Sequence, residues 1–126
     1  MFTLDHIISD RGSKYAVSGS PCADLDEARE LIAQLKARSK KFAKATHHSW
    51  GLIAASGPLK DDDGESGAGN IILKILEREG LSNHLVVVTR WYGGKHLGGD
   101  RFRHVRDAVM AYLAETAGSA PMRSGL

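Results

Sequence analysis

Residues 85–105 read Leu-Val-Val-Val-Thr-Arg-Trp-Tyr-Gly-Gly-Lys-His-Leu-Gly-Gly-Asp-Arg-Phe-Arg-His-Val. The β-branched run before Arg90 has no polar alternation, which predicts a strand buried on both faces. A glycine-rich loop follows it, and an amphipathic helix is expected from Asp100. A buried strand, a glycine turn and a helix N-terminus together present backbone N–H groups to an anion. This stretch therefore indicates both the centre of the fold and a candidate anion site.

The composition bounds the class of protein. The chain has 126 residues, 42% of them hydrophobic and 25% charged, which is typical of one globular domain. Its formal net charge of +2 does not by itself indicate a nucleic-acid partner. The single cysteine, Cys22, excludes an internal disulfide and is expected to be a small packing residue in a reducing, cytoplasmic compartment. No secretory signal or transmembrane run is present, so no membrane association is expected.

The segments on either side of this stretch are expected to form strands and helices. Two strands within residues 3–20 are joined by a turn at residues 10–12, and a strand is expected over residues 46–55. Asp24 and Glu27 form a candidate capping box for a first helix. Asn70 is the expected cap of a second helix, which Gly80 ends. The cation-rich run 36–44 is either a solvated face or a contact with phosphate or an acidic partner.

The last helix is expected over residues 100–117. Its predicted buried residues are Phe102, Val105, Val109, Tyr112 and Leu113. The order ββαβαβα predicts an α/β fold of the α+β, two-layer sandwich type, with a mixed sheet and helices on one face. Residues 1–117 are expected to form a single domain, followed by a flexible tail over residues 118–126.

Several motifs that carry known chemistry do not match. Gly93-Gly94-Lys95 lacks the earlier glycine and the Ser or Thr of a P-loop. The acidic loop at residues 61–64 lacks the glycine and glutamate of an EF-hand. His47 and His48 are adjacent on a strand and point to opposite faces, so they cannot chelate one metal together. We therefore predict no catalytic set, no metal and no cofactor. His96 and His104 could pair with Asp62 or Glu65 if the two loops meet.

Two loops remain as the candidate site. The first offers cations for phosphate and aromatic rings for stacking: Arg90, Trp91, Tyr92, Gly93, Gly94, Lys95, Arg101 and Arg103. The second forms a groove beside it: His47, Asp62, Asp63, Gly64 and Glu65. Each loop joins a strand to the next helix, which places both at the same edge of the sheet. One aromatic ring should pack inside and the other should be exposed, and both Gly93 and Gly94 should need a positive φ.

Four motifs carry a family resemblance over residues 10–117. They are Lys-Ala-Thr-His-His at 44–48, Asp-Asp-Gly-Glu at 62–65, Val-Val-Thr-Arg-Trp-Tyr-Gly-Gly at 87–94, and Leu-Gly-x-Asp-Arg-Phe-x-His at 97–104. This set strongly resembles the IMPACT family, which includes bacterial YigZ-type proteins and eukaryotic IMPACT translation regulators. The Trp-Tyr pair, and Ser66 in place of the proline usual in YigZ-type proteins, place the chain closer to the eukaryotic type. The resemblance implies a fold like the second domain of ribosomal protein S-five.

The resemblance also implies a role around translation or RNA, including translational or stress regulation. The N-terminal RWD domain of the eukaryotic regulators and the C-terminal ferredoxin-like domain of YigZ-type proteins are not expected here, so kinase regulation is not carried over. The leading hypothesis is a non-enzymatic domain that binds RNA or a ribosome-associated protein, without sequence-specific DNA binding. The alternative is a protein that binds an anionic metabolite or nucleotide, or a hydrolase, using Asp62, Asp63, Glu65 and Arg90. A third possibility is a protein-interaction module at the basic end of the first helix.

Overall fold

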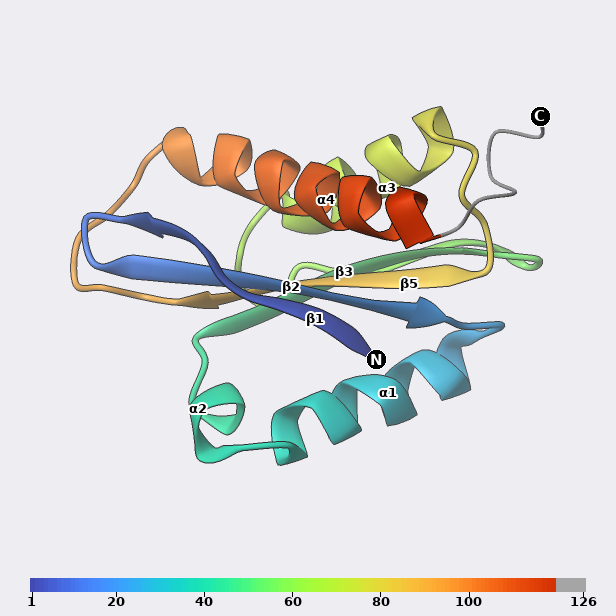
Figure 1. Ribbon diagram of the computed structural model, residues 1–126, viewed down its shortest axis with the longest axis horizontal. Helices are drawn as coiled ribbons and strands as arrows, with labels where there is room; N and C mark the ends of the chain where they lie inside the picture. The colour runs from blue at the N-terminus through green and yellow to red at the C-terminus, as the bar shows by residue number, and fades with distance from the viewer. Residues whose placement is uncertain (120–126) are drawn as a thin grey trace.

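The computed structural model describes residues 1–119, which form one five-stranded sheet with helices on both faces (Figure 1). The strand order is β1-β2-β5-β3-β4, and every neighbouring pair is antiparallel. The strands are β1 (Phe2–Asp10), β2 (Ser13–Pro21), β3 (His47–Ala54), β4 (Gly57–Asp61) and β5 (His84–Trp91). The helices are α1 (Leu25–Ala37), α2 (Lys40–Ala43), α3 (Ala68–Arg78) and α4 (Asp100–Ser119).

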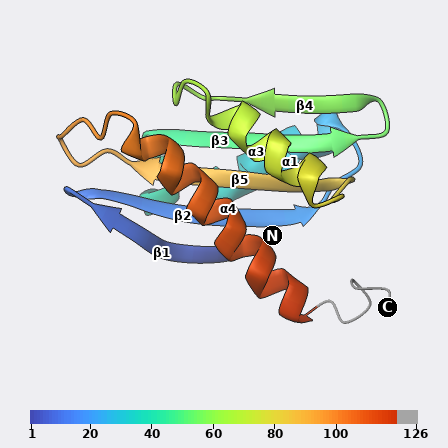
Figure 2. The same ribbon diagram turned by 90° about the horizontal axis from the view of Figure 1, so that it is seen from above.

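The central strand β5 sends alternate side chains into two separate cores. Val86 and Val88 pack under α3 and α4, whereas Leu85 and Val87 belong to the core under α1 and α2. Figures 1 and 2 show these two helix layers on opposite sides of the sheet. The predicted α+β sandwich is confirmed, but the predicted mixed sheet and single helical face are wrong. A strand that is apolar on both faces requires cover on both faces, and this is why α1 and α2 lie opposite the other two helices.

The predicted turn at residues 10–12 and the predicted cap of the first helix are confirmed with small changes. The hairpin turns at Arg11 and Gly12, both with positive φ. Glu27 N donates to Asp24 Oδ1 at 2.9 Å, but the Glu27 carboxylate accepts from Ala23 N rather than from the cap residue. The basic run at residues 36–44 contains the end of α1 and a second, short helix. Ser39 caps the short helix α2, and this turn brings Phe42 into the core.

Three expectations in the second half are corrected. The strand β4 forms where an acidic loop directly after β3 was expected. Helix α3 begins at Ala68 and not at Asn70, because Gly67 holds the left-handed backbone (φ 87°) that starts it. Phe102, predicted to be buried, is 39% exposed. Gly80 does end α3, with φ 66° and the paired hydrogen bonds from Gly80 N to Glu77 O and from Leu81 N to Leu76 O.

Helix α4 reaches Ser119, so the first two residues of the expected tail are helical. The rest of that expected tail, residues 120–126, lies outside the described residues. The other predicted buried positions of this helix, Val105, Val109, Tyr112 and Leu113, are buried. No helix within residues 1–119 combines the length and apolarity needed to cross a membrane.

Candidate functional site

The two candidate loops meet at one edge of the sheet, as predicted. The β4–α3 loop (residues 62–67) and the β5–α4 loop (residues 92–99) are both joined to the same edge in Figure 2. Together they line a pocket of about 490 Å³. Gly64 and Glu65 contribute from the first loop, Tyr92 and Gly98 from the second, and His47 from the start of β3. The pocket is therefore built from residues far apart in the sequence.

A buried ion pair joins the β4–α3 loop to the end of β5, and both of its residues line this pocket. Arg90 is 5% exposed and Glu65 is 3% exposed. Arg90 Nη1 donates to both carboxylate oxygens of Glu65 at 3.0 Å, and Arg90 Nη2 donates to Ser13 Oγ at 3.3 Å. Arg101 Nη1 lies 3.5 Å from the same carboxylate. The guanidinium expected to contact phosphate is instead held by an acidic side chain of the chain itself, so Arg90 shapes the site from below.

The start of the β5–α4 loop is fixed by its neighbours on both sides. Gly93 N donates to the Ser13 hydroxyl at 3.1 Å, and Tyr92 N donates to Thr46 Oγ1 at 2.9 Å. Of the two glycines, only Gly94 has the predicted positive φ (92°). Gly93 is required for a different reason, because a Cβ there would lie 2.1 Å from the carbonyl carbon of Gly12.

The carboxylates of the acidic loop are occupied by backbone donors. Asp62 accepts from Gly67 N at 3.0 Å and from Gly69 N at 2.8 Å, which makes it the cap of α3. Burial opposes ionisation of Asp62, but these two hydrogen bonds and the nearby Lys60 outweigh it, and they lower the pKa of this carboxyl below its ordinary value. Asp63 Oδ2 accepts from His48 N at 2.7 Å. Both side chains therefore have a structural role at this loop.

The adjacent histidines point to opposite faces, as expected. His47 Nδ1 lies 2.8 Å from Asp63 O; a carbonyl oxygen only accepts, so Nδ1 carries the proton. In the neutral ring, His47 Nε2 is then a hydrogen-bond acceptor. The His47 side chain lines the pocket. His48 is buried, with Nε2 donating to Phe42 O at 3.0 Å and Nδ1 accepting from Thr89 Oγ1 at 2.9 Å.

The expected partners of the other two histidines are wrong. His104 Nε2 contacts Asp10 Oδ2 at 2.7 Å, on the β1–β2 hairpin, instead of Asp62 or Glu65. Its ring also lies 5.3 Å from that of Tyr15. His96 lies beside Tyr92, with ring centroids 5.9 Å apart. The hairpin packs against the start of α4, and this long-range contact decides the partner of His104.

We expect acid to destabilise the fold through His48. Burial lowers the pKa of His48 below its ordinary value of 6.5. As the pH falls below that value, His48 therefore becomes protonated in the unfolded chain before it does so in the folded protein, and this favours unfolding. The free energy of unfolding should therefore fall between about pH 7 and pH 5, by at most ~1.4 kcal/mol per pH unit for one group. Urea midpoints across this range measure the effect.

The matched variant is His48→Gln, which removes the titrating group. Its stability should depend less steeply on pH than that of the unchanged protein. Burial lowers the pKa of His84 as well, so part of the slope should remain. A slope that is identical in His48→Gln would contradict this assignment.

The adjacent aromatic residues divide as predicted. The Trp91 ring packs edge-on against Phe42, with centroids 5.1 Å apart, and Trp91 Nε1 donates to Lys41 O at 2.8 Å. Tyr92 is 44% exposed and lines the pocket. An exposed aromatic ring is therefore available at the rim.

The cations around the pocket remain at the surface. Lys95 is exposed and makes no ion pair within residues 1–119. The Arg101 side chain is 32% exposed and also lines the pocket, and Arg103 is exposed beside Asp100 at 3.4 Å. No group of three or more His, Cys, Asp or Glu residues capable of holding a metal ion occurs in the described part of the chain.

Sequence reasoning missed two supports of the site. Ser13, which joins Arg90 to Gly93, begins β2 outside any motif, and Thr46, which holds Tyr92, lies just before β3. A local signal exists only for Thr46, because it precedes the two histidines within a motif already noted. Nothing near Ser13 in the sequence indicates its partners, since they lie 77 and 80 residues away.

Comparison with known proteins agrees with this architecture. The model of the family described as Impact N-terminal domain matches residues 11–113. Protein IMPACT of Rattus norvegicus is 34% identical over 114 residues, covering 86% of this chain and 36% of that protein. The Protein IMPACT homolog of Saccharomyces cerevisiae is 35% identical over 119 residues, covering 86% and 46%. The chain thus spans less than half the length of these two relatives.

One solved structure, described as that of a hypothetical protein, superposes with a TM-score of 0.77. It is 22% identical, and the match covers 89% of this chain and 57% of that one. At this identity the likeness concerns the fold alone. The family match covers most of the chain and all of the motifs that build the pocket, and we conclude that this chain belongs to the Impact N-terminal domain family.

Proposed function

We propose that this domain binds RNA at the edge where the two loops meet, as a binding module that acts around translation. One observation carries the proposal: the acidic side chains Asp62, Asp63 and Glu65 are engaged by donors of the chain itself, while the cations beside them are not buried. At this edge Lys95 makes no ion pair within residues 1–119, and Arg101 and Arg103 stay accessible to a ligand beside their acidic partners.

The geometry fits a single-stranded backbone with unstacked bases. Lys95, Arg101 and Arg103 supply cations for phosphates, and the N-terminus of α4 adds the positive end of a helix dipole. Tyr92 supplies an exposed ring on which a base stacks. The buried ion pair keeps both loops in place before the ligand arrives, which lowers the ordering cost of binding. The family resemblance adds the link to translation.

The double variant Arg101→Ala/Arg103→Ala should weaken binding of a labelled single-stranded RNA about tenfold at low salt. Each lost phosphate contact should also reduce the slope of log affinity against log salt by about 0.7. Fluorescence anisotropy across a salt series measures both quantities. The free energy of unfolding should change by no more than about 1 kcal/mol, because both side chains are partly exposed.

The control is Lys74→Ala/Arg78→Ala on α3, which removes the same charge from another surface. It should keep the affinity and the salt slope of the unchanged protein. Equal losses in the two double variants, or unchanged affinity in both, would eliminate RNA binding at this edge.

A small anionic ligand is the second candidate, because the pocket of about 490 Å³ is lined by the cationic side chain of Arg101. Such a ligand would raise the melting temperature progressively, as the logarithm of its concentration once the site is nearly saturated, and would not show the steep salt slope of RNA. Melting scans with inorganic phosphate and a nucleoside monophosphate separate the two candidates.

A further inference from the structure

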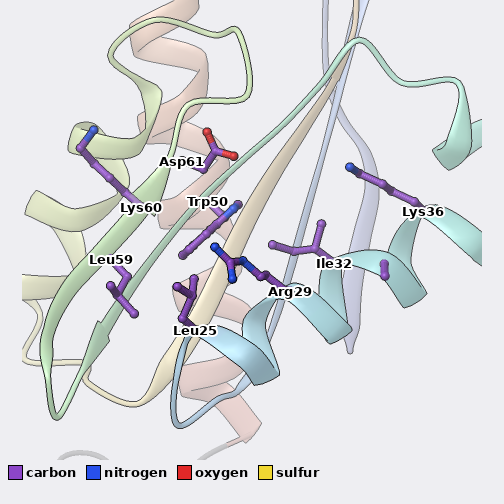
Figure 3. A pocket seen from close by; sticks show the side chains of 9 residues that line it. Leu25, Arg29, Ile32, Lys36, Trp50, Leu59, Lys60 and Asp61 are labelled. Carbon is purple, nitrogen blue, oxygen red and sulfur yellow. The ribbon is translucent and has the colours of Figure 1, made fainter.

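A second open pocket, of about 530 Å³, lies on the opposite face, between α1 and the strands β3 and β4 (Figure 3). We refer to it as the α1–β4 groove. Its apolar wall is formed by Leu25 and Ile32 from α1, Trp50 from β3 and Leu59 from β4. Strand β4 is an edge strand, so the groove opens at the edge of the sheet. It is separate from the loop pocket and does not depend on the RNA proposal.

Trp50 carries an unused hydrogen-bond donor in this groove. The residue is only 6% exposed. Its indole N–H makes no hydrogen bond within residues 1–119, and it is not among the fully buried side-chain atoms that lack a partner, so this donor is open to the groove. A buried tryptophan usually directs this group to a partner. Trp91 does so, because its indole N–H reaches Lys41 O. The Trp50 ring lies between α1 and β4 in Figure 3, where a ligand in the groove could supply an acceptor.

The charges along the groove favour an acidic ligand. Arg29 and Lys36 lie seven residues apart on α1, about two helical turns, so they share one side of that helix. Neither makes an ion pair in the described part of the chain. The facing carboxylate, Asp61, accepts a hydrogen bond from Asp63 N at 3.0 Å. Beyond Lys36 the positive charge continues along the run 36–44.

From these observations we infer that the α1–β4 groove binds an acidic peptide segment of a partner protein, with a bulky apolar side chain of that segment placed against Trp50, Leu59 and Ile32. The carboxylates of the segment pair with Arg29 and Lys36, and one of its oxygens accepts from the Trp50 indole N–H. An RNA strand fits less well, because the aliphatic walls of Leu25, Ile32 and Leu59 offer nothing to phosphates. A second copy would bring the same cations to the groove.

The test uses two-dimensional ¹H–¹⁵N NMR, in which each tryptophan indole N–H gives its own signal. The probe is the synthetic peptide acetyl-Glu-Asp-Glu-Leu-Phe-Glu-Asp-amide. The Trp50 signal should shift saturably as peptide is added, whereas the Trp91 signal should stay, because its donor is already bonded. Trp91→Phe assigns the two signals. A peptide with lysines in place of the acids, or with alanines in place of Leu-Phe, should not bind.

The double variant Arg29→Glu/Lys36→Glu should weaken peptide binding about tenfold or more. The control Lys74→Glu/Arg78→Glu makes the same charge change on α3 and should leave binding unaltered. A Trp50 signal that does not move at millimolar peptide, equal binding of the lysine peptide, or equal losses in both variants would overturn the inference. So would a shift of the Trp50 signal with protein concentration alone, which would assign the groove to a second copy, or its saturation by RNA.

Discussion

Replacing Glu65 by alanine should destabilise the domain by about 3–5 kcal/mol, the cost of leaving a buried charge without its partner. Arg90 is 5% exposed, and its Nη1 donates to both oxygens of this one carboxylate. Arg101 and the Ser13 hydroxyl cannot replace it, since a cation repels Arg90 and a hydroxyl carries no charge. Urea denaturation, with the midpoint and slope fitted together, measures the loss.

Two further variants separate the charge effect from the shape effect. Glu65→Gln keeps the shape and an acceptor but removes the charge, and should recover only part of the loss. The double variant Glu65→Leu/Arg90→Met removes both charges and should be closer in stability to the unchanged protein than Glu65→Ala. A loss below about 1 kcal/mol in Glu65→Ala would show that Arg90 finds solvent, contrary to its burial.

Replacing Gly93 by alanine should have an effect of similar size through a steric conflict. The new Cβ would lie 2.1 Å from Gly12 C and 2.4 Å from both Gly12 O and Ser13 N. All three are backbone atoms of the β1–β2 hairpin, so no side-chain rotation relieves the overlap. We expect a loss of about 3 kcal/mol or more, or displacement of the hairpin from the loop.

Gly94→Ala is the matched control at the neighbouring position. A Cβ on Gly94 meets nothing within 4 Å, so only its φ of 92° opposes the substitution. The expected loss is about 1–2 kcal/mol, and Gly94→Val should lie within ~1–3 kcal/mol. Thermal and urea unfolding of the two alanine variants then compare the steric cost at Gly93 with the cost of a positive φ at Gly94. Equal losses would show that the close approach to Gly12 relaxes easily.

Features that depend on neighbouring residues could be predicted from the amino-acid sequence. The apolar run before Arg90 identified the central strand, because it lacks any polar alternation. Asp24 capped α1, and Gly80 ended α3, because each acts within a few residues of its own position. The two loops share one edge for a reason that the sequence did not supply: β3 is antiparallel to β5, and the unpredicted strand β4 returns the chain from the far end of β3 to the edge where β5 ends.

The partners of the charged side chains at that edge, in contrast, follow from contacts between distant segments. Arg90 read as a ligand contact, yet it pairs with Glu65, 25 residues away, and His104 pairs with Asp10, 94 residues away. Asp62 looked like part of a groove, but it caps α3 from beyond the helix. A charged side chain that leaves water is stable only beside an opposite charge or donors, and the chain path between strands sets which one it meets. Local sequence patterns do not contain that path.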